Sequence, residues 1–282
     1  MKLESNGILI INKDKGYTSR DVVNVISKLF GTKKAGHNGT LDPLATGVLV
    51  VCLNRYTKLN EILASNEKEY IAEVTLGIQT DNLDIEGTVL EEKEVYINKD
   101  DLEKTLQKFV GDYEQEVPIY SAVKVNGRKL YEYARNGEEV VLPKKKVTIK
   151  KIELLDFKDD KFTFKCLVSK GTYIRSLIRD ILNDLDVIGT MCNLTRTRQG
   201  IFDIKNAYSL DEVRKGNYKL LLVKDVLDID KVTVSDELKF KILNGNKVKG
   251  NYSDMVLFLD EDGKELAIYK KDNDDYKVEV ML

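Results

Sequence analysis

Apolar positions follow a strand-like period in some segments and a helix-like period in others, which predicts a protein of mixed α and β structure. The predicted strands of the main part are Gly7–Asn12, Val48–Leu53, Tyr70–Leu76, Val147–Phe157 and Lys161–Val168. The predicted helices are Ser19–Phe30, Thr57–Ala64, a helix that begins after Asn98, Ile174–Leu185 and Ser209–Lys215. Strands outnumber helices, and they do not alternate regularly with them. We therefore expect an α+β fold with a largely antiparallel mixed sheet flanked by helices.

Two of the predicted helices have a clear apolar face. The first is capped at Thr18 or Ser19 and ends at Gly31, and its apolar face carries Val22, Val23, Ile26, Leu29 and Phe30. The second is capped by Asn98, and its inward positions are Leu102, Leu106, Phe109 and Val110. Both are expected to pack against the sheet.

The last fifty or so residues differ in character from the rest. Short apolar runs, such as Val256–Leu259 and Tyr276–Val280, are separated there by Asn-Gly and Asp-Gly turns. We expect two domains: a catalytic domain over 1–229 and a small β-rich domain over 230–282.

The composition is that of an ordinary globular protein: 282 residues, 42% hydrophobic and 33% charged. The three cysteines are far apart and form no Cys-x-x-Cys pair, so neither a disulfide framework nor a thiolate zinc site is indicated. The apolar stretch near the N-terminus is too short for a signal peptide, and no run reaches the length of a membrane span. We expect a cytoplasmic protein that does not enter a membrane.

Charge is distributed unevenly although the formal net charge is only −2. Residues 81–118 carry 12 acidic and 4 basic side chains, whereas residues 124–175 carry 14 basic and 7 acidic ones. Charge alone fits a solvated hairpin as well as a polyanion-binding surface. The tyrosines and arginines interleaved over Ser121–Arg135 favour the second reading, because both can stack on bases.

The candidates for chemistry are few. His37 is the only histidine, which argues against the common zinc sites and most Ser-His or Cys-His nucleophile systems. The distinctive residue is Asp42, which precedes Pro43 in a loop of small residues followed by an apolar strand. Local chemistry by itself favours a plain Asp-Pro turn.

A resemblance to a known family changes this reading. The stretch His37–Leu49, HNGTLDPLATGVL, resembles the signature of the TruB family of transfer RNA pseudouridine synthases. Four further segments in the same order resemble other parts of that family: Gly7–Ser19, Lys68–Tyr70, Pro118–Arg135, and Ser169–Arg175 together with Leu194–Arg196. The C-terminal stretch resembles the family's PUA-like RNA-binding domain less specifically.

The resemblance implies roles for particular residues. Asp42 aligns with the nucleophile, and Arg175 aligns with the arginine that pairs with it and whose planar fork can hold a carboxylate by two bonds. Tyr70 aligns with the tyrosine that stacks on the base, and Tyr173 and Leu194 align with residues that contact or wall off the substrate.

The resemblance also places His37 beside the nucleotide that is flipped out, although a lone histidine is more often structural. Lys13 completes the expected substrate-binding set. The chain departs from the family at Asp14, where proline is common, and at Asn38, where threonine is usual.

The activity implied is isomerisation of uridine to pseudouridine at the position conventionally numbered 55, in the T loop of transfer RNA. The expected partner is the T arm of transfer RNA, bound in part by a segment at about 119–146. We expect a monomer that needs neither a metal nor a cofactor.

Two other functions stay open at this stage. Asp42 and Thr46 have the spacing of an aspartyl-phosphate phosphotransferase, but Leu44 stands where the second aspartate would be. An RNA chaperone that opens the T-loop elbow without chemistry would use the same basic and aromatic surface.

Overall fold

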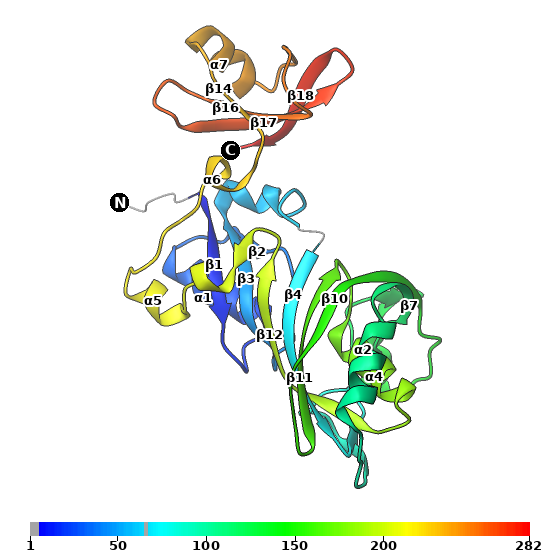
Figure 1. The fold of residues 1–282 in the computed structure, drawn as a ribbon. Coiled ribbons are helices and arrows are strands. Elements are labelled where there is room, and N and C mark those ends of the chain that lie inside the picture. The colour runs from blue at the N-terminus through cyan, green and yellow to red at the C-terminus, as the bar shows by residue number, and fades with distance from the viewer. Residues whose placement is uncertain (1–5, 65–66) are drawn as a thin grey trace.

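The computed structural model describes residues 6–64 and 67–282, so residues 1–5 and 65–66 of the predicted first domain lie outside it. Its main sheet has the order β1-β3-β12-β4-β11-β10-β7, with β2 paired to β3 and β13 paired to β12 (Figure 1). The strands are β1 (Gly7–Lys13), β2 (Ala35–His37), β3 (Thr46–Leu53), β4 (Glu67–Leu76), β7 (Gly111–Glu116), β10 (Lys144–Lys158), β11 (Lys161–Ser169), β12 (Gly189–Gln199) and β13 (Phe202–Asp203). All pairings are antiparallel except the short contact of β12 with β3. The predicted α+β class with a largely antiparallel mixed sheet is confirmed.

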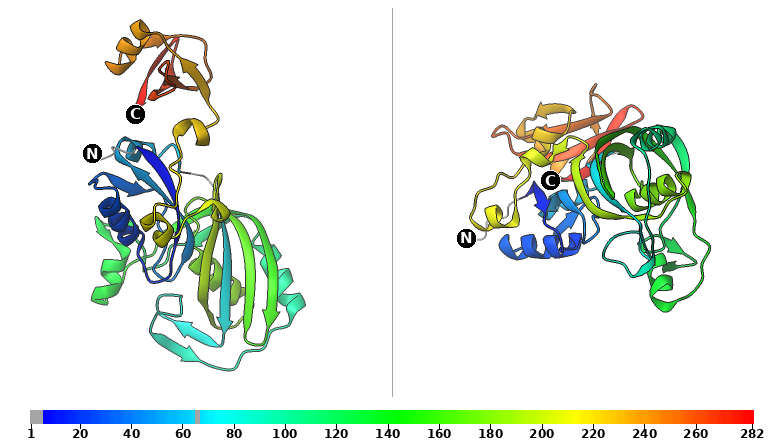
Figure 2. Two further views of the ribbon diagram at one scale, coloured as in Figure 1. Left: turned by 90° about the vertical axis from the view of Figure 1, so that its left-hand side faces the viewer. Right: turned by 60° about the horizontal axis from the view of Figure 1, so that its bottom comes forward.

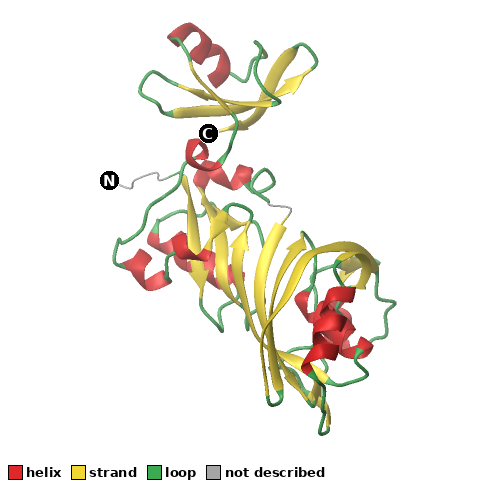
Figure 3. Cartoon of the chain, in the orientation of Figure 1, coloured by secondary structure: helices red, strands yellow, loops and turns green. Residues whose placement is uncertain are grey.

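The helices of this part of the chain are drawn in red in Figure 3. They are α1 (Ser19–Leu29), α2 (Lys99–Lys108), α3 (Leu130–Asn136), α4 (Ile174–Asp184), α5 (Leu210–Arg214) and α6 (Val223–Val226), with 3-10 turns at Asn54–Leu59 and Ile204–Asn206. Helices α2 and α4 share one apolar cluster with β4, β10 and β11, and helices α1 and α5 share another with β1 and β3. None of the helices in the described ranges is both long and apolar enough to cross a membrane.

Strands β1 and β3 are buried on both faces, which explains their continuous apolar runs. Leu9 and Leu49 face α1, whereas Ile8, Ile10 and Val48 face the last part of the chain. Burial of both faces favours apolar residues at successive positions, which accounts for the runs Ile8–Ile11 and Val48–Leu53.

Two small hairpins extend from the main sheet (Figure 2). They are β5 (Ile78–Thr80) with β6 (Val89–Glu92), and β8 (Lys124–Val125) with β9 (Arg128–Lys129). The second hairpin turns at Asn126 and Gly127, both with positive φ, as the Asn-Gly dipeptide predicts.

The last residues of the chain form a separate five-stranded sheet, seen at the top of Figure 1. Its order is β14-β16-β17-β18-β15, and its elements are β14 (Asp230–Thr233), α7 (Asp236–Leu243), β15 (Val248–Lys249), β16 (Met255–Leu259), β17 (Glu265–Asp272) and β18 (Asp275–Met281). One face packs on α7. The other contributes Leu257, Ile268 and Val280 to the apolar cluster that includes Ile8 and Val48. An apolar cluster therefore joins the two sheets.

Three details differ from the predictions. Thr57–Ala64 is not an α-helix: the chain forms a 3-10 turn over Asn54–Leu59, in which the Thr57 hydroxyl donates to the Asn54 carbonyl at 2.7 Å. Leu29 and Val110 are exposed by 44% and 43%. Leu29 is the last residue of α1, and Val110 lies beyond the end of α2, so neither is held against the sheet.

The contact between the two sheets gives a first testable expectation. The Tyr56 hydroxyl donates to the Glu265 carboxylate, and the other carboxylate oxygen of Glu265 accepts from the Lys224 amide at 2.7 Å. Tyr56→Phe leaves a buried carboxylate oxygen without its donor, so it should lower the free energy of unfolding by about 1–3 kcal/mol in urea titrations. The matched control is Tyr96→Phe, at a tyrosine exposed by 86%, which should change it by less than about 0.5 kcal/mol.

Candidate active site

The loop that carries Asp42 is fixed from both sides by the β1–α1 segment. The Ser19 hydroxyl accepts from the Leu41 amide at 2.8 Å, and the Pro43 carbonyl accepts from the Gly16 amide at 2.9 Å. Leu41, Leu44 and Ala45 are buried around it. Asp42 thus sits between anchored neighbours, with its side chain 37% exposed. The backbone on both sides of Asp42 is thus held by hydrogen bonds and by buried neighbours, which an exposed Asp-Pro turn does not need.

Lys13 is a second anchor of this loop. Its side chain is fully buried, and its ammonium donates to the carbonyls of Asp14, Tyr17 and Pro43 at 3.0, 2.6 and 3.2 Å. Burial lowers the pKa of Lys13 to about 8. Because backbone carbonyls occupy the ammonium, the geometry makes Lys13 a support for the Asp42 loop rather than a direct contact for a substrate.

Arg175 faces Asp42 from the first turn of α4. Its Nε lies 3.0 Å from Asp42 Oδ2, and its side chain is only 6% exposed. The two terminal nitrogens donate elsewhere, to the carbonyls of Asn82 at 2.9 Å and Tyr120 at 3.0 Å. The expected two-bond fork on the carboxylate is therefore corrected to a single contact, and the rest of the guanidinium is clamped by backbone.

Two segments form this clamp, and they are bonded to each other. The Tyr120 hydroxyl donates to Asp81 Oδ2 at 3.1 Å, and Asp81 precedes Asn82 in the chain. Sequence reasoning had assigned Asp81 and Asn82 only to an acidic segment, and no motif marked them. Their contribution is geometric: they set the direction in which Arg175 presents its Nε.

Asp42 and Arg175 line a cavity of about 310 Å³. Tyr70, Leu194 and Tyr173, all predicted site residues, also line it. The lining also includes Lys68, Tyr120, Ser121, Lys170, Gly171 and Arg196. The volume is at the small end of ligand pockets and suits one nucleoside better than a larger ligand. The structure thus brings five of the seven predicted site residues together around one space.

Two of the tyrosines that line the cavity, Tyr70 and Tyr173, are protonated at neutral pH. Tyr70 lies in β4, and burial raises the pKa of its hydroxyl, although the nearby Arg196 guanidinium opposes that rise. Burial also raises the pKa of Tyr173. Each therefore presents a neutral aromatic face to the cavity, which is the surface on which a base stacks.

Gln115, which no sequence signal marked, positions Tyr173. Its buried side chain accepts from the Tyr173 amide at 2.7 Å and donates to the Tyr173 carbonyl at 3.1 Å. This pair of bonds holds the start of α4 against β7. A glutamine in the polar run DYEQE looks like any exposed strand residue, so only the fold reveals its contact.

His37 lies beside the loop and is not among the residues lining the cavity. It ends β2, opposite Val51 in β3, and burial lowers the pKa of its imidazole, so the ring is neutral at pH 7. Its buried Nδ1 has no hydrogen-bond partner among the described residues. Because this nitrogen is buried and His37 does not line the cavity, contact with a flipped nucleotide stays a prediction.

Arg196 is a buried residue that supports the Asp42 loop by hydrogen bonds to its backbone. Its guanidinium donates to the carbonyls of Val48 at 2.7 Å, Gly39 at 2.9 Å and Thr40 at 3.3 Å, and its side chain is fully buried. Its own backbone packs on Gly47, where φ is +99° and a Cβ would overlap the Arg196 carbonyl. The sequence placed Arg196 in a motif but did not indicate that it supports the loop.

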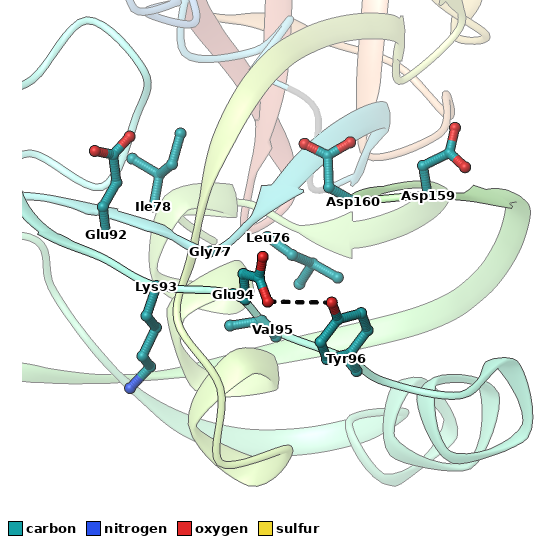
Figure 4. A pocket seen from close by; sticks show the side chains of 10 residues that line it. All are labelled: Leu76, Gly77, Ile78, Glu92, Lys93, Glu94, Val95, Tyr96, Asp159 and Asp160. Carbon is teal, nitrogen blue, oxygen red and sulfur yellow. Dashed lines mark hydrogen bonds between the residues drawn. The ribbon is translucent and has the colours of Figure 1, made fainter.

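A larger hollow, of about 750 Å³, lies at the other end of β4 (Figure 4). Glu92, Glu94, Asp159 and Asp160 line it, and the Tyr96 hydroxyl donates to Glu94 at 3.2 Å. At about 3.3 Å per residue, the six residues from Tyr70 to Leu76 put it roughly 20 Å from the Asp42 cavity. Its acidic lining repels a polyanion. No group of three His, Cys, Asp or Glu within the described ranges could hold a metal ion.

Comparison with known proteins identifies relatives of this chain. Residues 27–174 match the family described as TruB family pseudouridylate synthase (N terminal domain). A protein named tRNA pseudouridine synthase B from Caldanaerobacter subterraneus subsp. tengcongensis is 43% identical over 252 residues, covering 88% of each chain. Another of that name, from Staphylococcus aureus (strain MSSA476), is 41% identical over 286 residues, covering 94% of each chain.

Two solved structures share the fold. A Cbf5-Nop10-Gar1 complex superposes with a TM-score of 0.70 at 24% identity, over 98% of this chain and 84% of that one. An H/ACA ribonucleoprotein bound to a substrate RNA gives a TM-score of 0.68 at 23% identity, over 97% of this chain and 83% of that one. At these identities the likeness is one of fold alone.

Proposed function

The chain belongs to the TruB family of pseudouridylate synthases and is an isomerase that acts on transfer RNA, and from this premise we propose that it modifies the T-loop uridine at position 55 with Asp42 as the nucleophile. The observation that carries the proposal is the ion pair between Asp42 Oδ2 and Arg175 Nε at 3.0 Å, at the wall of a cavity of about 310 Å³. The buried Arg175 side chain holds one oxygen of the Asp42 carboxylate, the group that attacks in the proposed reaction, at the wall of the cavity.

The proposed reaction begins with extrusion of the uridine from the RNA stack, since the target atom is otherwise out of reach. The Asp42 carboxylate attacks the nucleoside, and the bond between the sugar and the uracil nitrogen breaks. The uracil then turns, and its carbon C5 bonds to the sugar carbon while the bond to the Asp42 carboxylate breaks, which returns Asp42 to its starting state. The proton lost from C5 is balanced by one gained at the freed nitrogen, so the product is an isomer.

The remaining residues of the cavity hold the base. Tyr70 offers an aromatic face, and Leu194 and Tyr173 exclude water from the reacting atoms. We propose that His37, which ends β2 beside the Asp42 loop, contacts the extruded nucleotide. Residues 230–282 act as a PUA-like RNA-binding domain beside the catalytic domain of 1–229. The partner is the T arm of transfer RNA, bound by a monomer in the cytoplasm.

A direct assay tests the reaction. The protein is incubated with a T-arm RNA hairpin, with and without a metal chelator, and pseudouridine is scored at position 55. We expect pseudouridine at that position in both cases. RNA that binds but keeps its uridine would favour a chaperone, and magnesium-dependent release of phosphate would favour a phosphotransferase.

Arg175→Lys tests the ion pair. A lysine has one nitrogen in place of three, so it cannot face Asp42 and also hold the carbonyls of Asn82 and Tyr120. The single-turnover rate at saturating RNA should fall more than tenfold, with a smaller change in binding. Arg179→Lys is the matched control: Arg179 lies one turn along α4, pairs with Glu116 and Asp180, and does not line the cavity. Equal rates for the two variants would contradict the proposed support of Asp42.

A further inference from the structure

Three lysines lie together at the rim of the Asp42 cavity. Lys68 and Lys170 line the cavity. Lys145 reaches it from β10, because its ammonium lies against Gly171, where a Cβ would overlap it. We call Lys68, Lys145 and Lys170 the rim lysines.

Strand alternation explains why one residue of the run Lys144–Lys146 reaches the rim. Lys145 is paired with Gln115 of β7, and side chains of paired residues lie on the same face. Gln115 contacts the Tyr173 backbone, so that face is turned toward the cavity. Lys146 points the opposite way and pairs with Asp112 at 3.1 Å.

Lys145 and Lys170 differ in their ion pairing from several lysines of β10 and β11. Lys146, Lys150, Lys151, Lys161 and Lys165 are each paired with a carboxylate. Lys145 and Lys170 form no ion pair with any residue that the structure describes. Asp42, the carboxylate of the cavity, is engaged by Arg175.

The electrostatic consequence is visible at Lys68. Its pKa is lowered to about 8, chiefly by burial and further by the positive charges of Arg196, Lys170 and Lys145. Like charges gathered at the edge of a cavity raise the free energy of the empty site, and an anion bound among them lowers it. The rim is therefore matched to an anionic group next to whatever occupies the cavity.

We propose that Lys145 and Lys170, together with Lys68, bind a backbone phosphate that flanks the extruded nucleotide. The inference rests on the proposed function: a nucleoside inserted beside Asp42 leaves its two flanking phosphates at the cavity rim. Lysine ammonium groups suit this contact because they act as point charges toward phosphate oxygens. The rim lysines thus hold the backbone while the base enters the cavity.

The first experiment measures binding of a T-arm hairpin to the full chain as a function of salt. Lys145→Gln and Lys170→Gln are each expected to weaken binding about five- to tenfold. Each should also reduce the slope of log K against log salt by about 0.7 to 0.9. Lys146→Gln, on the opposite face of the same strand, is the control and should change affinity less than about twofold.

The second experiment locates the phosphate. Hairpins carry one uncharged methylphosphonate linkage, either 5′ or 3′ of the target uridine or in the distal stem. Wild-type protein should lose affinity for one of the flanking substitutions and not for the distal one, and the double variant Lys145→Gln/Lys170→Gln should lose nothing further at that linkage. A double variant that is as sensitive as the wild type to both flanking substitutions would overturn the inference.

The two proposals fail in different ways in these samples. If the wild type binds the hairpin but forms no pseudouridine, the proposed function fails, and the linkage series still tests the phosphate contact. If the wild type forms pseudouridine and the rim variants behave like Lys146→Gln, only the inference about the rim lysines fails. A wild type that does not bind the hairpin overturns both.

Discussion

Asp42→Asn is expected to abolish pseudouridine formation while transfer RNA binding stays within about tenfold, a difference of about 1.4 kcal/mol. Asparagine has nearly the same shape, and its side-chain oxygen can still accept from Arg175 Nε. The anchors at Leu41 and Pro43 are backbone contacts that the substitution does not touch. The change therefore removes the negative charge of the attacking group and little else.

The measurement is single-turnover pseudouridine formation at saturating RNA, together with equilibrium binding to the same RNA. Asp14→Asn is the matched control, because Asp14 is an exposed aspartate in the turn that supports the loop, and only its carbonyl contacts Lys13. That variant should keep a rate within about threefold of the wild type. Substantial product from a clean preparation of Asp42→Asn would refute the assignment of the nucleophile.

The main elements of the fold were predictable because their burial leaves a direct pattern in the sequence. β1 and β3 carry continuous apolar runs, Ile8–Ile11 and Val48–Leu53, since helices cover one face and the C-terminal sheet contributes to the cover of the other. β12 was not predicted, although it lies at the centre of the main sheet. The sequence of β12, Gly189–Gln199, is rich in polar and charged residues. Two of its buried positions are Arg196 and Gln199, so the strand lacks the regular apolar alternation that predicts a strand. These two polar side chains are buried because they hydrogen-bond to residues far away in the sequence, and the sequence does not indicate those partners.

For the candidate site, the residues were predictable but their arrangement was not. A resemblance in motif named Asp42, Tyr70, Arg175 and Leu194, and the structure gathers them around one cavity. That Arg175 gives only Nε to Asp42 depends on two backbone carbonyls at positions 82 and 120, distant in sequence. Backbone acceptors leave no signature in side-chain identity.

Arg196 shows the largest gap between pattern and structure, and its replacement is expected to cost the most stability. Its guanidinium is fully buried and donates to three backbone carbonyls, at Val48, Gly39 and Thr40. Two of these carbonyls belong to the loop just before Asp42, and the third belongs to β3 just after it. One side chain thus joins the two ends of the segment that presents Asp42.

Arg196→Met fills a similar volume but leaves those carbonyls without a donor, and each buried unpaired polar group costs about 1–3 kcal/mol. Removing a buried charge returns part of that cost, so the free energy of unfolding should fall by about 2–4 kcal/mol in urea titrations. Arg198→Met, on the same strand, is the control, because Arg198 is only half-buried and donates to one carbonyl, that of Gly200; its change should stay below about 1 kcal/mol.

Arg196→Lys distinguishes an effect on the position of the Asp42 loop from an effect on the stability of the whole fold. Lysine keeps the charge but cannot reach all three carbonyls, so at a temperature where the variant is folded its single-turnover rate should still fall at least tenfold. Circular dichroism fixes that temperature before the rate is measured. A folded Arg196→Lys variant with the wild-type rate would show that Arg196 holds the sheet together without positioning Asp42.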